Sequence, residues 1–165
     1  MTAPLVRPAE PRDVPTLGRL GAALVRLHHE WDALRFIAPM PGVEQGYGRY
    51  LRGLMGDADS IVLVAALPDS PDDVVGYCYG AMRGRDWELL LDPHGVIHDV
   101  YVDEHARRRG VGRGLVLAAC AALEAKGAPR VLLSTATANE EGQALFASLG
   151  FRPTMIEMTR ERGGS

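Results

Sequence analysis

Short apolar runs alternate along the chain with segments whose apolar residues recur every third or fourth position, and this alternation predicts the order of the elements. The short runs predict strands over 5–9, 61–66, 74–79, 96–102, 131–135 and 151–158. The helical spacing predicts helices over 13–27, 47–55, 111–126 and 139–149. Because a turn of Pro, Asp and Ser joins the strands at 61–66 and 74–79, these two are expected to form an antiparallel hairpin. The pattern predicts an α/β fold with a mixed central sheet whose N-terminal half is antiparallel.

Composition narrows the class of protein. The chain has 165 residues, 47% of them hydrophobic, and contains no repeat or low-complexity tract, which predicts a single domain over residues 1–165. The net charge of −3 lacks the basic footprint of a nucleic-acid-binding protein. There is no signal-like N-terminus and no apolar run long enough for a bilayer, so we expect a cytoplasmic protein with no membrane partner. Cys78 and Cys120 lie in apolar segments without metal-ligand spacing, so neither a disulfide nor a metal site is expected.

A turn rich in arginine and glycine separates the predicted strand 96–102 from the predicted helix 111–126. From position 107 it reads Arg-Arg-Arg-Gly-Val-Gly-Arg-Gly. Backbone N–H groups of such a turn point into one concavity, and the start of the helix adds the positive end of its dipole, so the turn is typical of a phosphate site. A P-loop is excluded because Gly112 is followed by Arg113-Gly114 and not by Lys and Ser or Thr. A dinucleotide fingerprint is weak because position 130 is Arg130 and not an acid. A solvated arginine run is the other interpretation.

The motif Arg107-x-x-Gly110-x-Gly112 resembles the Q/R-x-x-G-x-G/A signature of the GNAT family of acetyl-CoA-dependent N-acetyltransferases. A second block downstream is similar to the family's strand, Asn-initiated helix and terminal Gly-Phe: it comprises 131–135, Asn139, Leu145-Phe146 and Gly150-Phe151. The resemblance in element order covers roughly residues 61–160.

The resemblance implies a GNAT-type fold with about four helices around the sheet, in which the strands at 96–102 and 131–135 run parallel and then splay apart. Acetyl-CoA would enter the opening between them as co-substrate, with no metal required. A bulge in the first of these strands would leave a backbone N–H to polarise the thioester carbonyl. The residues implied to bind the cofactor are Val100, Tyr101, Val102, Arg107, Arg108, Arg109, Gly110, Val111, Gly112, Arg113, Gly114, Asn139 and Phe146.

Catalysis by direct attack requires the acceptor amine to lose a proton. Family members often place a glutamate on the strand before the turn, whereas this sequence has His98 and Asp99 there. A histidine suits a general base near neutral pH, and an aspartate suits an anchor for a cationic amine. Side chains of neighbouring strand residues point to opposite faces, so only one of the two faces the acceptor unless a bulge intervenes. The acidic residues near the expected acceptor site favour a cationic amine or are simply solvated: Glu30, Asp32 and Glu44.

One position departs from the family pattern. Family members commonly carry a tyrosine seven residues after the motif asparagine, where its hydroxyl protonates the departing thiolate, but this chain has Phe146. We expect slower chemistry rather than none, with Tyr101, Ser134 or water as substitutes. The sequence thus predicts an N-acetyltransferase for a small cationic amine or a peptide or protein amine, as a possible homodimer. The alternative is a catalytically weak acyl-CoA-binding or regulatory module of the same fold.

Overall fold

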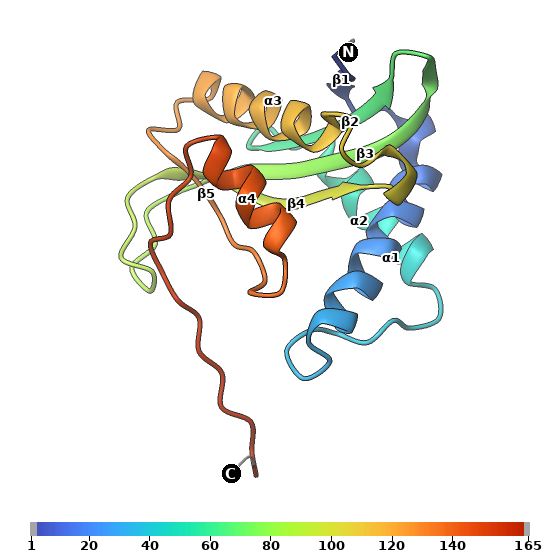
Figure 1. The fold of residues 1–165 in the computed structure, drawn as a ribbon. Coiled ribbons are helices and arrows are strands. Elements are labelled where there is room, and N and C mark those ends of the chain that lie inside the picture. Colours follow the sequence, from blue (N-terminus) through green and yellow to red (C-terminus); the bar gives the residue numbers. More distant parts are fainter. Residues whose placement is uncertain (1–2, 164–165) are drawn as a thin grey trace.

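A five-stranded mixed sheet forms the centre of the molecule (Figure 1). The computed structural model describes residues 3–163. The strands lie side by side in chain order: β1 (Leu5–Pro8), β2 (Ser60–Leu67), β3 (Ser70–Arg83), β4 (His94–Val102) and β5 (Val131–Leu133). The first four are antiparallel to their neighbours, and β5 runs parallel to β4. The predicted mixed sheet with an antiparallel N-terminal half is confirmed.

Helices cover both faces of this sheet. The four α-helices are α1 (Val14–Trp31), α2 (Val43–Leu54), α3 (Val111–Ala125) and α4 (Glu140–Ser148). On one face α3 inserts Leu115, Ala119 and Leu123 into the core, and each is 0% exposed, as the predicted helical stripe requires. On the other face α1 and α2 pack against the tyrosines of β3. Because both faces are covered, β2 is buried along its whole length, which explains the unbroken apolar run at 61–66.

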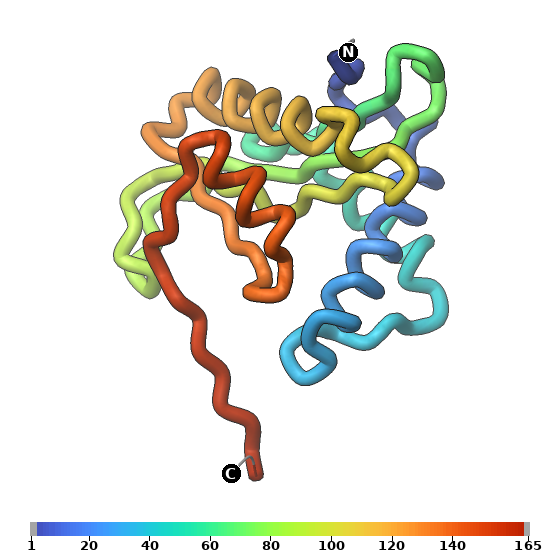
Figure 2. Tube along the Cα trace, viewed as in Figure 1, coloured from blue at the N-terminus to red at the C-terminus, as the bar shows by residue number. Residues whose placement is uncertain are grey.

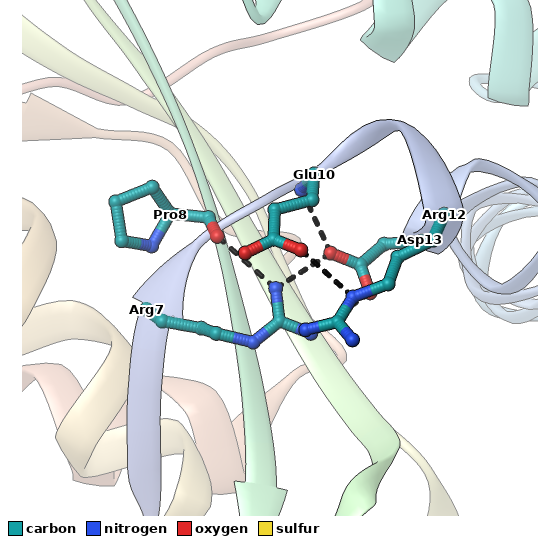
Figure 3. A network of polar contacts seen from close by, with 5 residues as sticks. All are labelled: Arg7, Pro8, Glu10, Arg12 and Asp13. Carbon is teal, nitrogen blue, oxygen red and sulfur yellow. Dashed lines mark hydrogen bonds and ion pairs between the residues drawn. The ribbon is translucent and has the colours of Figure 1, made fainter.

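An ion-pair network joins β1 to the start of α1 (Figure 3). Two guanidinium nitrogens of Arg7 donate to the two carboxylate oxygens of Asp13 at 2.7 and 2.9 Å. The Asp13 carboxylate also accepts the backbone N–H of Glu10 at 2.8 Å, and Arg12 pairs with Glu10. Burial alone would raise the pKa of Asp13, but these hydrogen bonds hold it below its usual value. The pair fixes the angle at which α1 leaves the sheet.

Two predicted elements are corrected by the structure. The predicted final strand at 151–158 is wrong: the segment has no strand partner within residues 3–163 and runs away from the body of the molecule (Figure 2). Pro153 has no N–H for a ladder, and Met155, Ile156 and Met158 remain exposed. The second helix begins at Val43 rather than near 47, because Gly42 adopts a φ of 80° at its N-cap and turns the chain into the helix earlier.

Within residues 3–163, no helix combines the length and the apolar character that crossing a membrane requires.

Candidate active site

The two parallel strands separate at the middle of the molecule. They pair at only three positions, from Gly95 opposite Val131 to Ile97 opposite Leu133. Beyond Ile97, β4 continues to Val102 while β5 ends, so the predicted splay is confirmed. On this part of β4, the backbone N–H and C=O groups of successive residues point alternately toward β3 and toward the opening. The N–H of Asp103 donates to the Val75 carbonyl of β3, whereas the Val102 carbonyl points away from β3 and accepts Nε–H of Arg107 at 3.1 Å. By the same alternation, the backbone of Val100 faces the opening.

A bulge at His98 places both candidate catalytic side chains on one face of the sheet. Tyr79 of β3 lies opposite Asp99 and Gly80 lies opposite Ile97, so His98 is the extra residue. His98 stacks on Tyr79, with ring centroids 5.0 Å apart, and Asp99 contacts Tyr77. All of these contacts are on the α1 and α2 side of the sheet.

A cavity of about 270 Å³ occupies the opening. Both His98 and Asp99 line it. The wall on the side of β5 and α4 comprises Leu133, Ser134, Thr135, Asn139 and Phe146. The opposite wall comes from α1, the segment after it and α2, and comprises Leu24, Val25, His28, Phe36, Ile37 and Tyr47. One cavity therefore joins the expected cofactor cleft to a second, largely apolar space. The acids Glu30, Asp32 and Glu44 are exposed and do not line it.

Asp99 is held by two tyrosine hydroxyls. Tyr47 of α2 and Tyr77 of β3 both donate to its Oδ2, the latter at 3.1 Å. Burial raises the pKa of the Asp99 carboxyl, although the two hydrogen bonds act in the opposite direction. Tyr47 reaches this position because Gly21 of α1 leaves room for its ring: a Cβ at Gly21 would lie 2.0 Å from Tyr47 Cδ1. The carboxylate is thereby hydrogen-bonded to α2 through a tyrosine that packs against α1.

His98 is already engaged by a cation. A guanidinium nitrogen of Arg83 lies 3.0 Å from Nε2 of His98, and because a guanidinium can only donate, Nε2 must accept. Burial, and then the charge of Arg83, lower the pKa of His98. This imidazole is therefore neutral at pH 7, and its unprotonated nitrogen is occupied.

A second histidine in the cavity was missed by the sequence analysis. Nδ1 of His28 lies 2.9 Å from the carbonyl oxygen of Leu24, so Nδ1 carries the proton and Nε2 is the accepting nitrogen of the neutral ring. The ring packs edge-on against Trp31 and Phe36, with centroids 4.9 and 4.8 Å away. The sequence did contain one signal for His28: it lies four residues after Leu24, so it falls on the same stripe of α1 that faces the sheet.

The arginine and glycine turn presents free backbone donors. Arg108 and Gly110 adopt positive φ values of 58° and 81°, and the first hydrogen bond inside α3 runs from Gly114 N–H to the Gly110 carbonyl at 2.9 Å. The N–H groups of Val111, Gly112 and Arg113 therefore precede the first turn of the helix and have no partner in it. Three adjacent donors at a helix N-terminus suit a diphosphate.

Most arginines of the turn bind acceptors of the protein itself. Arg107 donates to the Val102 carbonyl and lies over the ring of Tyr101, with its Cζ 5.8 Å from the centroid. Arg108 pairs with Glu141 of α4, and Arg109 lies 3.2 Å from Asp69 in the β2–β3 turn. Arg113 is exposed.

Packing accounts for two of the glycines in this turn. A Cβ at Gly112 would lie 3.2 Å from Leu145 of α4, and one at Gly114 would lie 2.9 Å from Pro4. The small size of these two glycines thus lets α3 approach α4 and the segment before β1, independently of any contact with a ligand.

Asn139 is the N-cap of α4 and also faces the cavity. Its Oδ1 accepts Gly142 N–H at 3.0 Å, and its Nδ2 donates to Thr135 at 3.0 Å. The asparagine side chain folds over Gly142 and leaves no room for a larger residue, since a Cβ there would lie 2.3 Å from Nδ2 of Asn139. Phe146 lies one turn beyond Gly142 on the helix and is half-buried, with its ring edge-on to that of Phe151. Across residues 3–163, no group of three His, Cys, Asp or Glu side chains is placed to hold a metal ion.

The Acetyltransferase (GNAT) family model matches residues 25–151 of this sequence, a span that contains the turn and every residue that lines the cavity except Leu24. The chain belongs to the GNAT family. Proteins of similar sequence include mycothiol acetyltransferase of Thermobispora bispora, which is 36% identical over 91% of this chain and 63% of that protein. Mycothiol acetyltransferase of Nocardioides sp. is 32% identical over 58% of this chain and 34% of that protein. The chain therefore spans less than two thirds of the length of these GNAT relatives.

Solved GNAT structures share the fold. Glucosamine-6-phosphate N-acetyltransferase from Arabidopsis thaliana superposes with a TM-score of 0.70 at 15% identity, over 97% of this chain and 99% of that chain. A GCN5-related N-acetyltransferase from Ralstonia eutropha JMP134 superposes with a TM-score of 0.70 at 23% identity, over 98% of this chain and 100% of that chain. At these identities the likeness concerns the fold and leaves the acceptor open.

Proposed function

We propose that this GNAT protein transfers the acetyl group of acetyl-CoA to a primary amine by direct attack. The observation that carries the proposal is a cavity that joins the splay of β4 and β5 to the half-buried Asp99 carboxylate. One side of it opens on the backbone of β4, and the other presents an anion that attracts an ammonium group.

The residues present fit the co-substrate in two places. The free N–H groups at the start of α3 would hold the diphosphate, and the unpaired edge of β4 at Val100 would bond the amides of the pantetheine arm. The ion pairs of Arg108 with Glu141 and of Arg109 with Asp69 are exposed, so little free energy opposes exchanging these carboxylates for phosphate. When bound, acetyl-CoA supplies an activated thioester.

The proposed reaction proceeds without an acyl-enzyme. The ammonium loses one proton, and the neutral nitrogen bonds to the carbonyl carbon. The C–S bond then breaks, the nitrogen gives up a second proton as the amide forms, and the departing thiolate takes up a proton. Proximity in a shared cavity supplies a large part of the rate. Cys78 is buried and burial raises its pKa to a value far from that of a nucleophilic thiolate, which supports direct transfer to the amine.

In this proposal Asp99 anchors the ammonium, and His98 and His28 are the two imidazoles beside it. His98 must first give up its hydrogen bond from Arg83 before Nε2 can accept a proton. His28 has its Nδ1 fixed by a backbone carbonyl, which is the arrangement that orients the other nitrogen as an acceptor. Phe146 has no proton to give, so water or Ser134, which lines the cavity, would protonate the thiolate; Tyr101, the other predicted substitute, does not line the cavity.

The test is acetyl-CoA-dependent release of free thiol in the presence of amine mixtures, together with the melting temperature in acetyl-CoA. Turnover establishes the transferase. A protein that acetyl-CoA stabilises but that releases no thiol with any amine is instead the weak acyl-CoA-binding module, which Phe146 favours. Arg113→Ala should weaken the stabilisation by acetyl-CoA. Arg130→Ala is the matched control, because Arg130 is exposed at the opposite end of β4.

A further inference from the structure

The acceptor half of the cavity is almost entirely apolar. Its wall consists of two aliphatic residues of α1, the side chains of Phe36 and Ile37, and the rings of His28 and Tyr47. Within residues 3–163, no lysine or arginine lines the cavity, and the only carboxylate is that of Asp99. An acceptor bound here therefore meets one anion and otherwise hydrocarbon or aromatic surface.

The single anion is oriented for one ammonium group. Both tyrosine hydroxyls donate to Oδ2 of Asp99, and in the part of the chain that the structure describes Oδ1 has no hydrogen-bond partner. A primary ammonium needs hydrogen-bond acceptors, and Oδ1 provides the strongest one in the cavity. The rings of Tyr47 and His28 flank the same space, and an aromatic face beside a cation adds further stabilisation.

The same lining disfavours two other kinds of amine. A phosphate or carboxylate on the acceptor would lie near Asp99 with no lysine or arginine among the described lining residues to pair with it, since the guanidinium of Arg83 contacts His98 but does not itself line the cavity. A second ammonium, as in a polyamine, would lie against the half-buried Phe36 and the 63% exposed Ile37, where no second carboxylate among the described residues lines the cavity. Arg35 does not line the cavity: its exposed guanidinium pairs with Glu157 and lies over the ring of Phe36, with its Cζ 5.0 Å from the centroid.

We propose that the acceptor is a small monocationic primary amine on an apolar alkyl or arylalkyl body. Its ammonium would lie at Asp99 and its body against the wall formed by Val25, Phe36 and Ile37. This inference rests on the proposed acetyl transfer and names the substrate class of the same cavity. This substrate class differs from what the names of the similar proteins suggest. One relative is named mycothiol acetyltransferase, and one structural neighbour is named for glucosamine 6-phosphate, a sugar phosphate.

The test compares matched pairs of acceptors by thiol release. Phenethylamine and phenylalanine share one body and differ by a carboxylate, whereas hexylamine and 1,6-diaminohexane differ by a second amine. We expect kcat/KM to be at least tenfold higher for phenethylamine than for phenylalanine, and at least tenfold higher for hexylamine than for 1,6-diaminohexane. The reverse order in both pairs, or faster turnover of glucosamine 6-phosphate or of the acceptor of mycothiol acetyltransferase, overturns the inference while leaving acetyl transfer intact. No release with any amine, in a protein stabilised by acetyl-CoA, instead overturns the proposed function.

A variant of the wall gives an independent readout. Ile37→Asp adds a second carboxylate to the apolar wall, so the preference for hexylamine over 1,6-diaminohexane should fall by about tenfold or reverse. Leu34→Asp is the matched control: it lies in the same segment, is 79% exposed and does not line the cavity. An unchanged preference in a folded Ile37→Asp protein would show that Ile37 does not contact the acceptor and would overturn the assignment of this wall.

Discussion

The hydroxyl of Tyr47 on α2 donates a hydrogen bond to the carboxylate of Asp99 on β4, across 52 positions of sequence. Tyr77 of β3 donates to the same oxygen, so a helix that covers the acceptor space and two strands of the sheet converge on one anion. The arrangement depends on Gly21, beside which the ring of Tyr47 lies. Any change in the position of α2 is thus transmitted directly to the group proposed to bind the substrate.

Removing one of these donors should shift the pH dependence of the enzyme. The hydrogen bond from Tyr47 lowers the pKa of Asp99 against the larger effect of burial, so Tyr47→Phe should raise that pKa. Because Asp99 binds the ammonium in its ionised form, the acidic limb of the kcat/KM profile should move to higher pH, and the KM of the amine at pH 7 should rise by about three- to tenfold. Tyr50→Phe is the control, because Tyr50 packs edge-on against Tyr47 but is half-exposed and has no hydrogen bond to Asp99 in the described residues. A loss of kcat at all pH values with no shift of the limb would contradict this role.

Asp99→Asn should separate activity from stability. Burial raises the native pKa of Asp99 above its unfolded value, so the native state binds more protons between these two pKa values and loses stability as pH rises through that window. Asparagine carries no such cost and can still accept from Tyr47 and Tyr77. We expect a melting temperature at pH 7 equal to or above that of the parent, with amine acetylation reduced by about 100-fold or more. Melting temperatures of parent and variant measured from pH 4 to pH 8 test this dependence. The increase in melting temperature of Asp99→Asn over the parent should disappear at the acidic end, where the Asp99 carboxyl of the parent is protonated.

The two histidines of the cavity can be told apart by substitution. Nε2 of His98 accepts from Arg83, whereas Nε2 of His28 is left as the accepting nitrogen by the bond of Nδ1 to Leu24. We therefore expect His28→Gln to lower kcat about ten- to 100-fold and His98→Gln to lower it less than threefold, measured with saturating acetyl-CoA. A larger loss from His98→Gln would assign the proton transfer to the residue that the sequence pattern named.

Sequence patterns identified the elements with strong local signals. The stripe from Val111 to Leu123 predicts α3 because every member faces the same core, and Asn139 predicts the start of α4 because its cap is made within three residues. The last strand was wrong because pairing depends on a neighbouring strand and not on the apolar run at 151–158 alone. Local periodicity carries no information about that neighbour.

The candidate site was predictable only in part for the same reason. The family motif pointed to the turn at Gly110 and to His98 and Asp99, which line the cavity together because of the bulge. Tyr47 and His28 were missed because their roles arise from contacts between elements distant in sequence. Glycines at positions 18 and 21 in the middle of a helix are unfavourable by propensity, and they were the local signs that α2 approaches α1 closely there.

Phe146→Tyr tests whether the missing phenol limits the rate. Phe146 lines the cavity on the side of α4, so a hydroxyl added to its ring would project toward the cofactor cleft. If protonation of the leaving thiolate limits turnover, kcat should rise by about tenfold. Phe151→Tyr, which alters the ring that packs against Phe146 but does not line the cavity, is the control. An unchanged kcat would mean that water already protonates the thiolate fast enough.

The Arg7–Asp13 pair predicts a stability effect remote from the cavity. Asp13 is 5% exposed, so Arg7→Ala leaves a buried carboxylate without its cation and should lower the free energy of unfolding at pH 7 by about 2 kcal/mol. Because the native pKa of Asp13 is held below its unfolded value, the pair stabilises the protein above the unfolded pKa, and this contribution is lost as pH falls through the native pKa. Urea unfolding at pH 7 and at pH 3 should therefore show the difference between parent and variant shrinking with acid. Arg12→Ala is the control, since Arg12 and Glu10 are both largely exposed and their pair contributes little. A difference that is constant with pH would mean that Arg7 acts through packing on β1 and not through the charge of Asp13.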